Sequence, residues 1–376
     1  MSILALETSC DDTCAAVLRP DGGMAANVIS SQHVHDRFGG VVPEIASRHH
    51  LEIVDVVVAE ALAEAEVSLA DIQLVAATRG PGLVGALLVG LSAAKAIACA
   101  RELPFVPVDH LQGHVAANFL ACPDTPAASD AGRASGPRDV PAPFEPPFVC
   151  LIASGGHTLL AHVTDQEGFR ILGTTLDDAA GEAFDKGARM LGLGYPGGPA
   201  LERLARDGDA GAFSFPGSSA ERARGGKGAA RQRFERGLDF SFAGLKTALL
   251  YAIRELGPDA AHAQAADLAA SYQAAIVERL LDRCSQALQD TGLDRLAVGG
   301  GVACNGELRR RLAELGATLH LPARELCTDN AAMIASAARF APAIAFPHYL
   351  SLDAYATGER PSAGPELAAR AQPQAS

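Results

Sequence analysis

One arrangement, a strand followed by a polar turn and a second strand, occurs twice in the chain. Residues 3–6 and 14–18 are rich in aliphatic side chains and flank a polar turn near the N-terminus. The same arrangement recurs at residues 148–153 and 158–163, where the turn contains two glycines. A chain of 376 residues also exceeds what one hydrophobic core usually serves. The sequence therefore predicts two related lobes.

Helical and strand patterns alternate around the two hairpins, which is typical of an α/β protein. In the first half we expect a helix at 43–65, a strand at 74–78, a helix after Gly82 and a strand at 105–108. In the second half we expect helices at 175–191, 200–207, 242–256 and 263–291, a strand at 296–298, a helix from about Gly306 and another at 331–340. These patterns predict lobe I at 1–120, lobe II at 148–335, and a C-terminal helix and disordered tail at 336–376.

Two segments lack such patterns. Residues 121–147 are rich in Pro, Ala, Ser, Gly and Asp, which predicts a flexible linker or surface insertion. Residues 218–236 are rich in Gly and Arg, which is compatible with a basic surface loop for RNA or with an ordinary solvated loop.

Charge and composition exclude several classes of protein. The formal charge of −13 argues against broad, unassisted binding to nucleic acid, because neutralising phosphates needs a basic face. The most apolar stretch, 83–100, is interrupted by glycines and a lysine, so it predicts a buried helix and no membrane span. Eight scattered cysteines without a C-x-x-C pair, and an N-terminus without the features of a signal peptide, predict a cytoplasmic protein.

His110 and His114 lie four residues apart, so on a helix both imidazoles share one face and can bind one metal ion. A zinc peptidase needs a glutamate directly after the first histidine, and Leu111 occupies that position. Asp329 offers a third, oxygen ligand, and two imidazoles with one carboxylate leave coordination positions open. The alternative is a pair of buried structural histidines.

Three glycine turns, at 155–156, 197–198 and 299–301, leave bare backbone that a ligand can approach. Each alone is more typical of a tight turn, but the last lies between a strand and a helix, an arrangement compatible with a nucleotide. Asp178, Glu182 and Asp185 are spaced to share one helix face. Asp185 could accept hydrogen bonds from ribose hydroxyls if this face borders a nucleotide.

Together these segments resemble the TsaD/Gcp family, the tRNA threonylcarbamoyladenosine synthases once described as O-sialoglycoprotein endopeptidases. The resemblance covers the chain from Leu4 to about Ala335. Its motifs are Glu7-Thr-Ser-Cys-Asp-Asp-Thr13, Gly39-Gly-Val-Val-Pro-Glu44, Gly80-Pro-Gly-Leu-Val-Gly-Ala86, His110-x-x-x-His114, Ser154-Gly-Gly-His-Thr158, Thr175-Leu-Asp-Asp-Ala-Ala-Gly-Glu-Ala-Phe-Asp-Lys186, Tyr195-Pro-Gly-Gly-Pro199, Asp239-Phe-Ser-Phe-Ala-Gly-Leu-Lys246, Gly299-Gly-Gly-Val-x-x-Asn305 and Cys327-Thr-Asp-Asn330. Gln112, Asp12 and Ala331 depart from the common pattern, and none of them is an expected ligand.

The resemblance implies a two-lobed α/β fold of the actin-like, Hsp70-like and sugar-kinase-like ATPases, with a nucleotide cleft between the lobes. It implies that His110, His114 and Asp329 bind the metal. The residues that it implies for threonylcarbamoyl-AMP are Ile152, Ala153, Ser154, Gly155, Gly156, Asp185, Gly198 and Asn305. Asp11 and His157 are expected to face the same cleft.

The implied activity is transfer of the threonylcarbamoyl group from threonylcarbamoyl-AMP to N6 of the adenosine 3′ of the anticodon, in tRNAs that read codons beginning with A. The implied cofactors are one divalent metal per chain, Fe2+ with Zn2+ as the alternative, and an adenine nucleotide. The implied partners are tRNA, TsaB-like and TsaE-like proteins and a TsaC/Sua-type synthase that supplies the adenylate, with no membrane. A small-molecule kinase of the same fold, a non-catalytic scaffold and a metal-dependent endopeptidase are the competing interpretations.

Overall fold

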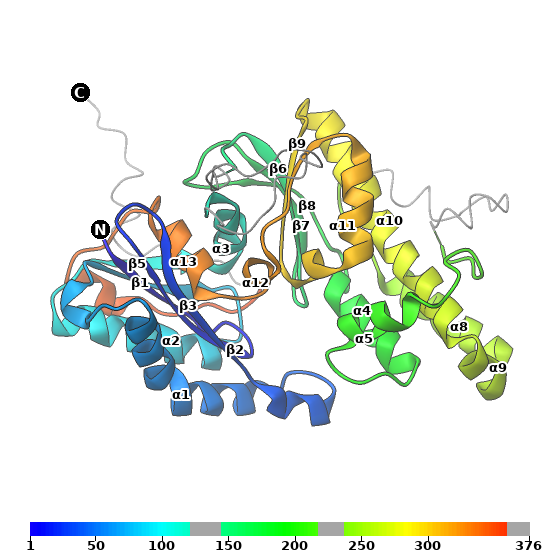
Figure 1. Cartoon of the computed structure of the whole chain (residues 1–376), viewed down its shortest axis with the longest axis horizontal. Coiled ribbons are helices and arrows are strands. Elements are labelled where there is room, and N and C mark those ends of the chain that lie inside the picture. Colours follow the sequence, from blue (N-terminus) through cyan, green and yellow to red (C-terminus); the bar gives the residue numbers. More distant parts are fainter. Residues whose placement is uncertain (121–143, 217–236, 359–376) are drawn as a thin grey trace, which may run out of the picture. The chain divides into compact units, whose positions relative to one another are not determined.

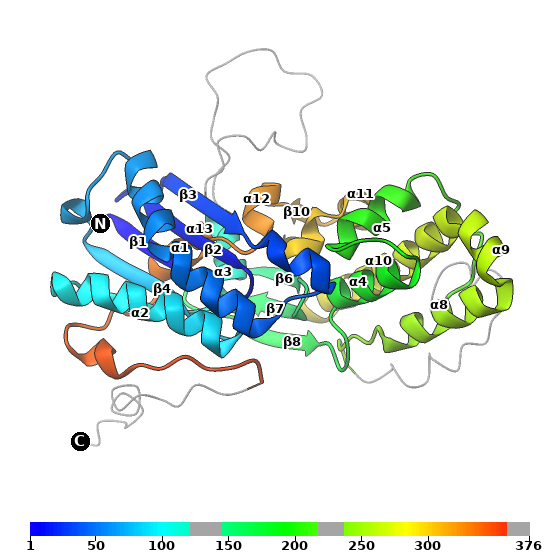
Figure 2. The same cartoon turned by 90° about the horizontal axis from the view of Figure 1, so that it is seen from below.

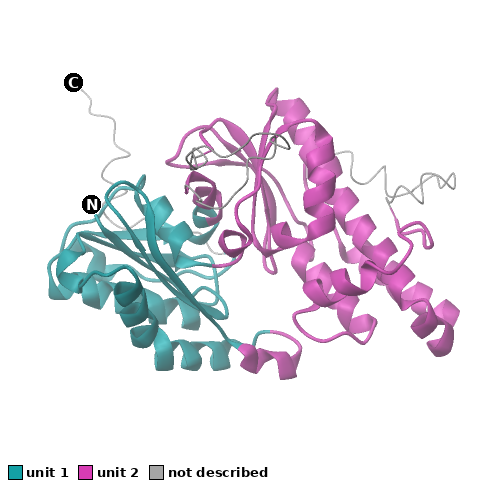
Figure 3. Ribbon diagram, in the orientation of Figure 1, with its two compact units in different colours: residues 1–32, 41–113, 330–376 teal, residues 33–40, 114–329 magenta. Residues whose placement is uncertain are grey.

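The computed structural model describes residues 1–120, 144–216 and 237–358, which form two compact units (Figure 3). Unit 1 comprises Met1–Gln32, Val41–Gly113 and the chain from Asn330 onward, and unit 2 comprises His33–Gly40 and His114–Asp329. Most of the predicted linker at 121–147, the predicted basic loop at 218–236 and most of the predicted C-terminal tail lie outside the described residues. The lobe limits inferred from the sequence stay a prediction.

Unit 1 is built on a mixed sheet with the strand order β3-β2-β1-β4-β5 (Figure 1). The strands are β1 (Ile3–Glu7), β2 (Asp12–Leu18), β3 (Met24–Ser31), β4 (Leu74–Gly80) and β5 (Phe105–Asp109). The first three pair antiparallel, and β4 and β5 continue the sheet in parallel with β1. Ile3 lies opposite Leu18, which confirms the predicted N-terminal hairpin.

Helices cover both faces of the unit 1 sheet. On one face, α1 (Pro43–Glu64) and α2 (Val84–Ala100) pack against each other and share a buried core with alternate residues of the strands, such as Leu4 and Leu6. On the other face lies α13 (Ala331–Ala338), whose eight residues are all buried. The apolar stretch at 83–100 is thus a packed helix. Across the described residues, no helix is both long and apolar enough to cross a membrane.

Unit 2 repeats the strand arrangement of unit 1. Its sheet has the order β10-β9-β6-β7-β8, formed by β6 (Phe148–Ala153), β7 (Thr158–Val163), β8 (Arg170–Thr174), β9 (Arg295–Gly299) and β10 (Thr318–His320). Here too an antiparallel hairpin is extended by a third antiparallel strand on one side and by two parallel strands on the other. The second predicted hairpin is confirmed, and the shared topology agrees with two related halves.

The longest described helix of unit 2 is α10 (Ala265–Thr291), which is buried along much of its length and is followed by Gly292 in the left-handed conformation. The other described α-helices that lie wholly in unit 2 are α4 (Ala180–Met190), α5 (Gly197–Ala205), α8 (Ala243–Leu256), α9 (Pro258–Ala263), α11 (Gly306–Leu312) and α12 (Arg324–Cys327). Figure 2 shows α4, α8 and α10 side by side. Side chains from these helices and from β6 and β7 form one hydrophobic core.

The helix expected at 175–191 begins only at Ala180, so the start of that prediction was wrong. The preceding residues find other partners, because the Leu176 N–H donates to the Phe240 carbonyl and the Thr175 hydroxyl to the Asp178 carbonyl. Asp178 therefore precedes the helix and does not continue its acidic face. Its carboxylate instead accepts a hydrogen bond from the Lys186 ammonium at 2.7 Å.

Candidate active site

The helix with the two histidines is held at its first turn by Asp109, the last residue of β5. The Asp109 carboxylate accepts hydrogen bonds from the backbone N–H groups of Leu111 at 2.9 Å and Gln112 at 3.1 Å, which caps α3 (His110–Ala116). The Tyr355 hydroxyl donates to the same carboxylate at 2.6 Å. Because strand, cap and helix are continuous in the chain, the direction of β5 fixes where both imidazoles lie.

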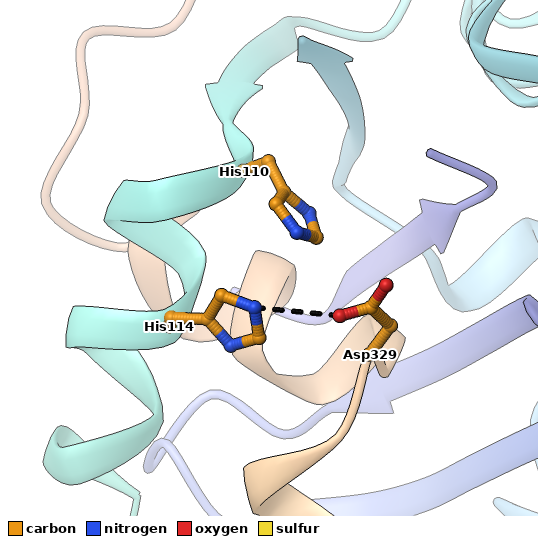
Figure 4. A group of neighbouring side chains, drawn as sticks. All are labelled: His110, His114 and Asp329. Carbon is orange, nitrogen blue, oxygen red and sulfur yellow. Dashed lines mark ion pairs between the residues drawn. The ribbon is translucent and has the colours of Figure 1, made fainter. Parts of the chain in front are cut away.

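The structure brings together the three metal ligands that the sequence predicted (Figure 4). His110 and His114 are both buried, and Asp329 lies between α12 and α13. The Nε2 atom of His114 is 3.3 Å from a carboxylate oxygen of Asp329, and one possible ligand atom from each of the three residues lies within 4.8 Å of the others. The next residue, Asn330, caps α13 by accepting from the Met333 N–H, which fixes the backbone beside Asp329.

This set of side chains fits a divalent metal ion. Ligand atoms bound tetrahedrally to one ion at about 2.0–2.1 Å are about 3.3–3.4 Å apart, so the most widely separated of these atoms, up to 4.8 Å apart, would draw together when an ion binds. Two imidazoles and one carboxylate suit Fe2+ and Zn2+ alike. Leu111 follows the first histidine on the helix, where a zinc peptidase carries its glutamate base.

Glu7 contacts this site, although the sequence patterns assigned it no role of its own. Its buried carboxylate accepts hydrogen bonds from the Ser9 N–H and the Thr78 hydroxyl, and it lies 3.2 Å from Nδ1 of His110. Glu7 and His110 are 103 residues apart in sequence, so no local spacing could relate them. The order of strands does relate them. Glu7 is the last residue of β1 and Asp109 the last residue of β5, and parallel strands of one sheet have their carboxyl ends at the same edge, so Glu7 is expected to lie near the start of the helix that follows β5.

Hydrogen bonds within the turn between β6 and β7 hold its shape, and the space beside its two glycines is empty. The Ser154 N–H donates to the His157 carbonyl at 2.8 Å, and the His157 N–H donates to the Ser154 hydroxyl at 3.1 Å. A side chain built at Gly155 or Gly156 would meet nothing within 4 Å. The Gly181 N–H donates to the Ser154 carbonyl, which ties the turn to α4. A ligand can therefore approach the backbone of both glycines.

Asp185 joins α4 to the second glycine turn. Its carboxylate accepts hydrogen bonds from the N–H groups of Gly197 at 2.9 Å and Gly198 at 3.1 Å. Burial raises the pKa of Asp185 above its ordinary value, and the two backbone hydrogen bonds oppose that rise. Asp185 and Gly198, which the resemblance places in one substrate site, are thus in direct contact.

The remaining predicted substrate residues are placed as follows. The side chains of Ile152 and Ala153 are buried in the sheet, so only their backbone can reach a ligand. Asn305 caps α11 by accepting from the Leu308 N–H, and its amide donates to Gln273 at 2.9 Å. Asp11 lies in the β1–β2 turn of unit 1, whereas the others belong to unit 2. Their roles in binding stay predictions.

Comparisons with known proteins assign the family. A family model described as TsaD, tRNA N6-adenosine threonylcarbamoyltransferase, matches residues 23–136 and 132–336. The chain belongs to the TsaD family. A tRNA N6-adenosine threonylcarbamoyltransferase of Pelobacter propionicus is 48% identical over 342 residues, which cover 89% of this chain and 90% of that protein. A protein of the same name from Clostridium perfringens is 45% identical, with coverage of 90% and 92%. Membership of this family makes the chain a transferase and a tRNA-modification enzyme.

Solved structures agree on the fold. The chain is similar to HypF of T. kodakarensis, with a TM-score of 0.54 and 14% identity over 90% of this chain and 47% of that one. It is also similar to component A of the (R)-2-hydroxyglutaryl-CoA dehydratase of Acidaminococcus fermentans, with a TM-score of 0.50 and 14% identity over 89% and 96%. At this identity the similarity concerns the fold alone, and it confirms the predicted actin-like α/β class.

Proposed function

We propose that this enzyme transfers the threonylcarbamoyl group from threonylcarbamoyl-AMP to N6 of the adenosine 3′ of the anticodon, in tRNAs that read codons beginning with A. The observation that carries the proposal is the 48% identity to a named threonylcarbamoyltransferase over nearly the whole chain. The convergence of His110, His114 and Asp329 supports it, because a kinase of the same fold gives no reason for this group.

The chemistry of the proposed donor suits the side chains present. Threonylcarbamoyl-AMP is a mixed anhydride and is already activated, so the transfer requires no covalent serine or cysteine nucleophile. His110, His114 and Asp329 would hold a divalent metal, Fe2+ or Zn2+, which acts as a Lewis acid and neutralises negative charge. The open backbone at Gly155 and Gly156 gives the adenylate room to lie close to the β6–β7 turn.

The proposed assembly includes partners besides the tRNA. We infer that TsaB-like and TsaE-like proteins act with this chain in the cytoplasm, and that a TsaC/Sua-type synthase supplies the adenylate. The formal charge of −13 supports a need for partners, since this chain alone offers little net attraction to phosphate.

The proposal is tested by incubating tRNA with the purified chain, threonine, bicarbonate, ATP and the proposed partners, followed by mass spectrometry of the tRNA nucleosides. We expect threonylcarbamoyladenosine with the natural protein and none above background with His114→Ala or Asp329→Asn. The matched control is His33→Ala, which removes a histidine whose side chain is 85% exposed. A wild-type yield from His114→Ala would refute the metal site, and no product from the natural protein would refute the activity.

A further inference from the structure

The contacts of His110 favour one position for the proton on its ring. Nδ1 lies 3.2 Å from a carboxylate oxygen of Glu7 and 3.2 Å from the hydroxyl oxygen of Ser9. An ionised carboxylate only accepts hydrogen bonds, so an Nδ1 without a proton would set two lone pairs against each other. When Nδ1 carries the proton, the N–H donates a hydrogen bond to the carboxylate. The lone pair of the neutral ring is then on Nε2.

The carboxylate of Glu7 is itself held in place. Glu7 is fully buried at the end of β1, and it accepts from the backbone N–H of Ser9 and from the hydroxyl of Thr78 on β4. Buried carboxylates are tolerated when donors surround them in this way. The position of the Glu7 carboxylate is therefore set by two strands of the sheet, independently of its contact with His110.

We propose that Glu7 is a positioning residue that keeps the proton of His110 on Nδ1 and so presents Nε2 to the metal. Figure 4 shows the ring of His110 pointing toward His114 and Asp329, which is the direction that a ligand nitrogen needs. A carboxylate behind a ligating histidine fixes the orientation of the ring and raises its basicity. The inference rests on the metal site of the proposed function.

Ser9 offers the alternative explanation, because its hydroxyl could donate to an Nδ1 that carries no proton. That arrangement would place the proton on Nε2 and prevent His110 from binding a metal through that atom. The carboxylate at the same distance disfavours it, since an ionised Glu7 would then face a lone pair. The Ser9 hydroxyl can donate or accept and so fits either tautomer, whereas the carboxylate fits only one, so the two residues serve as a matched pair in an experiment.

The first test measures the affinity of the purified full chain for Zn2+ by competition with a chelating dye. Glu7→Gln keeps the size of the side chain but replaces an acceptor with an N–H donor, so we expect roughly 10- to 100-fold weaker binding. Ser9→Ala, which keeps the backbone donor to Glu7, should bind like the natural chain. His114→Ala should lose the site. Unchanged affinity in folded Glu7→Gln, with loss in His114→Ala, would overturn the inference.

The second test needs neither metal nor a folded Glu7 variant. In the metal-free natural chain, long-range proton–nitrogen NMR spectra distinguish a proton on Nδ1 from one on Nε2, and His110→Ala identifies the signal. We expect the Nδ1-protonated form, and a predominant Nε2-protonated form would overturn the role of Glu7. If the natural chain binds no Zn2+ or Fe2+, the proposed metal site fails, while the tautomer still shows whether Glu7 sets the proton.

Discussion

At the scale of single residues, two glycines of unit 2, Gly155 and Gly173, differ in the space that surrounds them. Gly155 has open space around it, whereas a Cβ at Gly173 would lie 2.2 Å from the Leu238 carbonyl oxygen. We expect Gly155→Ala to leave the free energy of unfolding in urea near the natural value and to raise the KM for the adenylate. Gly173→Ala should cost about 1–3 kcal/mol of stability through overpacking. A normal KM in Gly155→Ala would place the donor away from this turn.

The thiol of Cys304 gives a second prediction at this scale. A hydrogen bond from the Cys327 thiol lowers the pKa of Cys304 to about 7, helped by the charges of Arg309 and Arg324 and opposed by burial. Only the thiolate reacts with alkylating reagents, so reactivity rises as the pH increases through the pKa. We expect the rate of iodoacetamide labelling at Cys304, followed by peptide mass spectrometry, to be half-maximal near pH 7. Cys304→Ser supplies the blank, and a midpoint near the ordinary thiol value of 9.0 would contradict the assignment.

At the scale of elements, the strands β6 and β7 have the bounds predicted from the sequence, whereas α4 does not. The two strands are short apolar runs with a glycine turn between them, so local pattern and tertiary pairing agree. Residues 175–179 carry a helical pattern, but Thr175 and Leu176 pair with Phe240, a distant segment that no local pattern reveals. For the same reason β3 was not predicted, because only its pairing with β2 defines it.

The candidate site shows the same division. The pair on α3 follows from four-residue spacing alone, and the residue that completes it, Asp329, was identified as the missing oxygen donor. Glu7 could not be identified in this way, because its contact with His110 depends on the order of strands in the sheet. Local periodicity predicts helices and strands, whereas the order of strands in the sheet decides which of their ends lie together.

The short strand β10 gives a prediction about pH. Its last residue, His320, stacks on Phe144 with ring centroids 5.0 Å apart. Burial lowers the pKa of His320 to about 4, helped by the charge of Arg295. Between pH 6.5, the pKa of the unfolded state, and pH 4, the unfolded chain binds a proton at His320 that the folded chain does not. The contribution of His320 to the free energy of unfolding is therefore complete above pH 6.5 and is lost as the pH falls. The full loss amounts to about 3 kcal/mol.

We expect His320→Phe to retain the stacking and to lose less stability than the natural chain between pH 7 and pH 4.5. Urea unfolding at both pH values measures this difference. Equal losses in the two proteins would show that His320 titrates normally in the fold.

At the scale of the whole molecule, a metal that binds only the folded chain must stabilise it. At a free Zn2+ concentration about 100 times the Kd, the gain is about 2.7 kcal/mol, and the midpoint of thermal unfolding should rise accordingly. His114→Ala should remove the rise, whereas His33→Ala should keep it. A rise of the same size in His114→Ala would mean that Zn2+ binds elsewhere on the chain.

The division of unit 1 into separate stretches of chain has a consequence for synthesis. Its strands leave the ribosome early, but α13, which covers one face of their sheet, is made only after all of unit 2. Domains generally fold as units during translation, so we expect the growing chain to keep an apolar sheet face exposed until residues 331–338 emerge. In ribosome complexes stalled at increasing chain lengths, a chaperone that binds exposed apolar surface should bind until α13 has emerged from the ribosome. Equal binding at all lengths would contradict this expectation. The first strands made would then be among the last to complete their core.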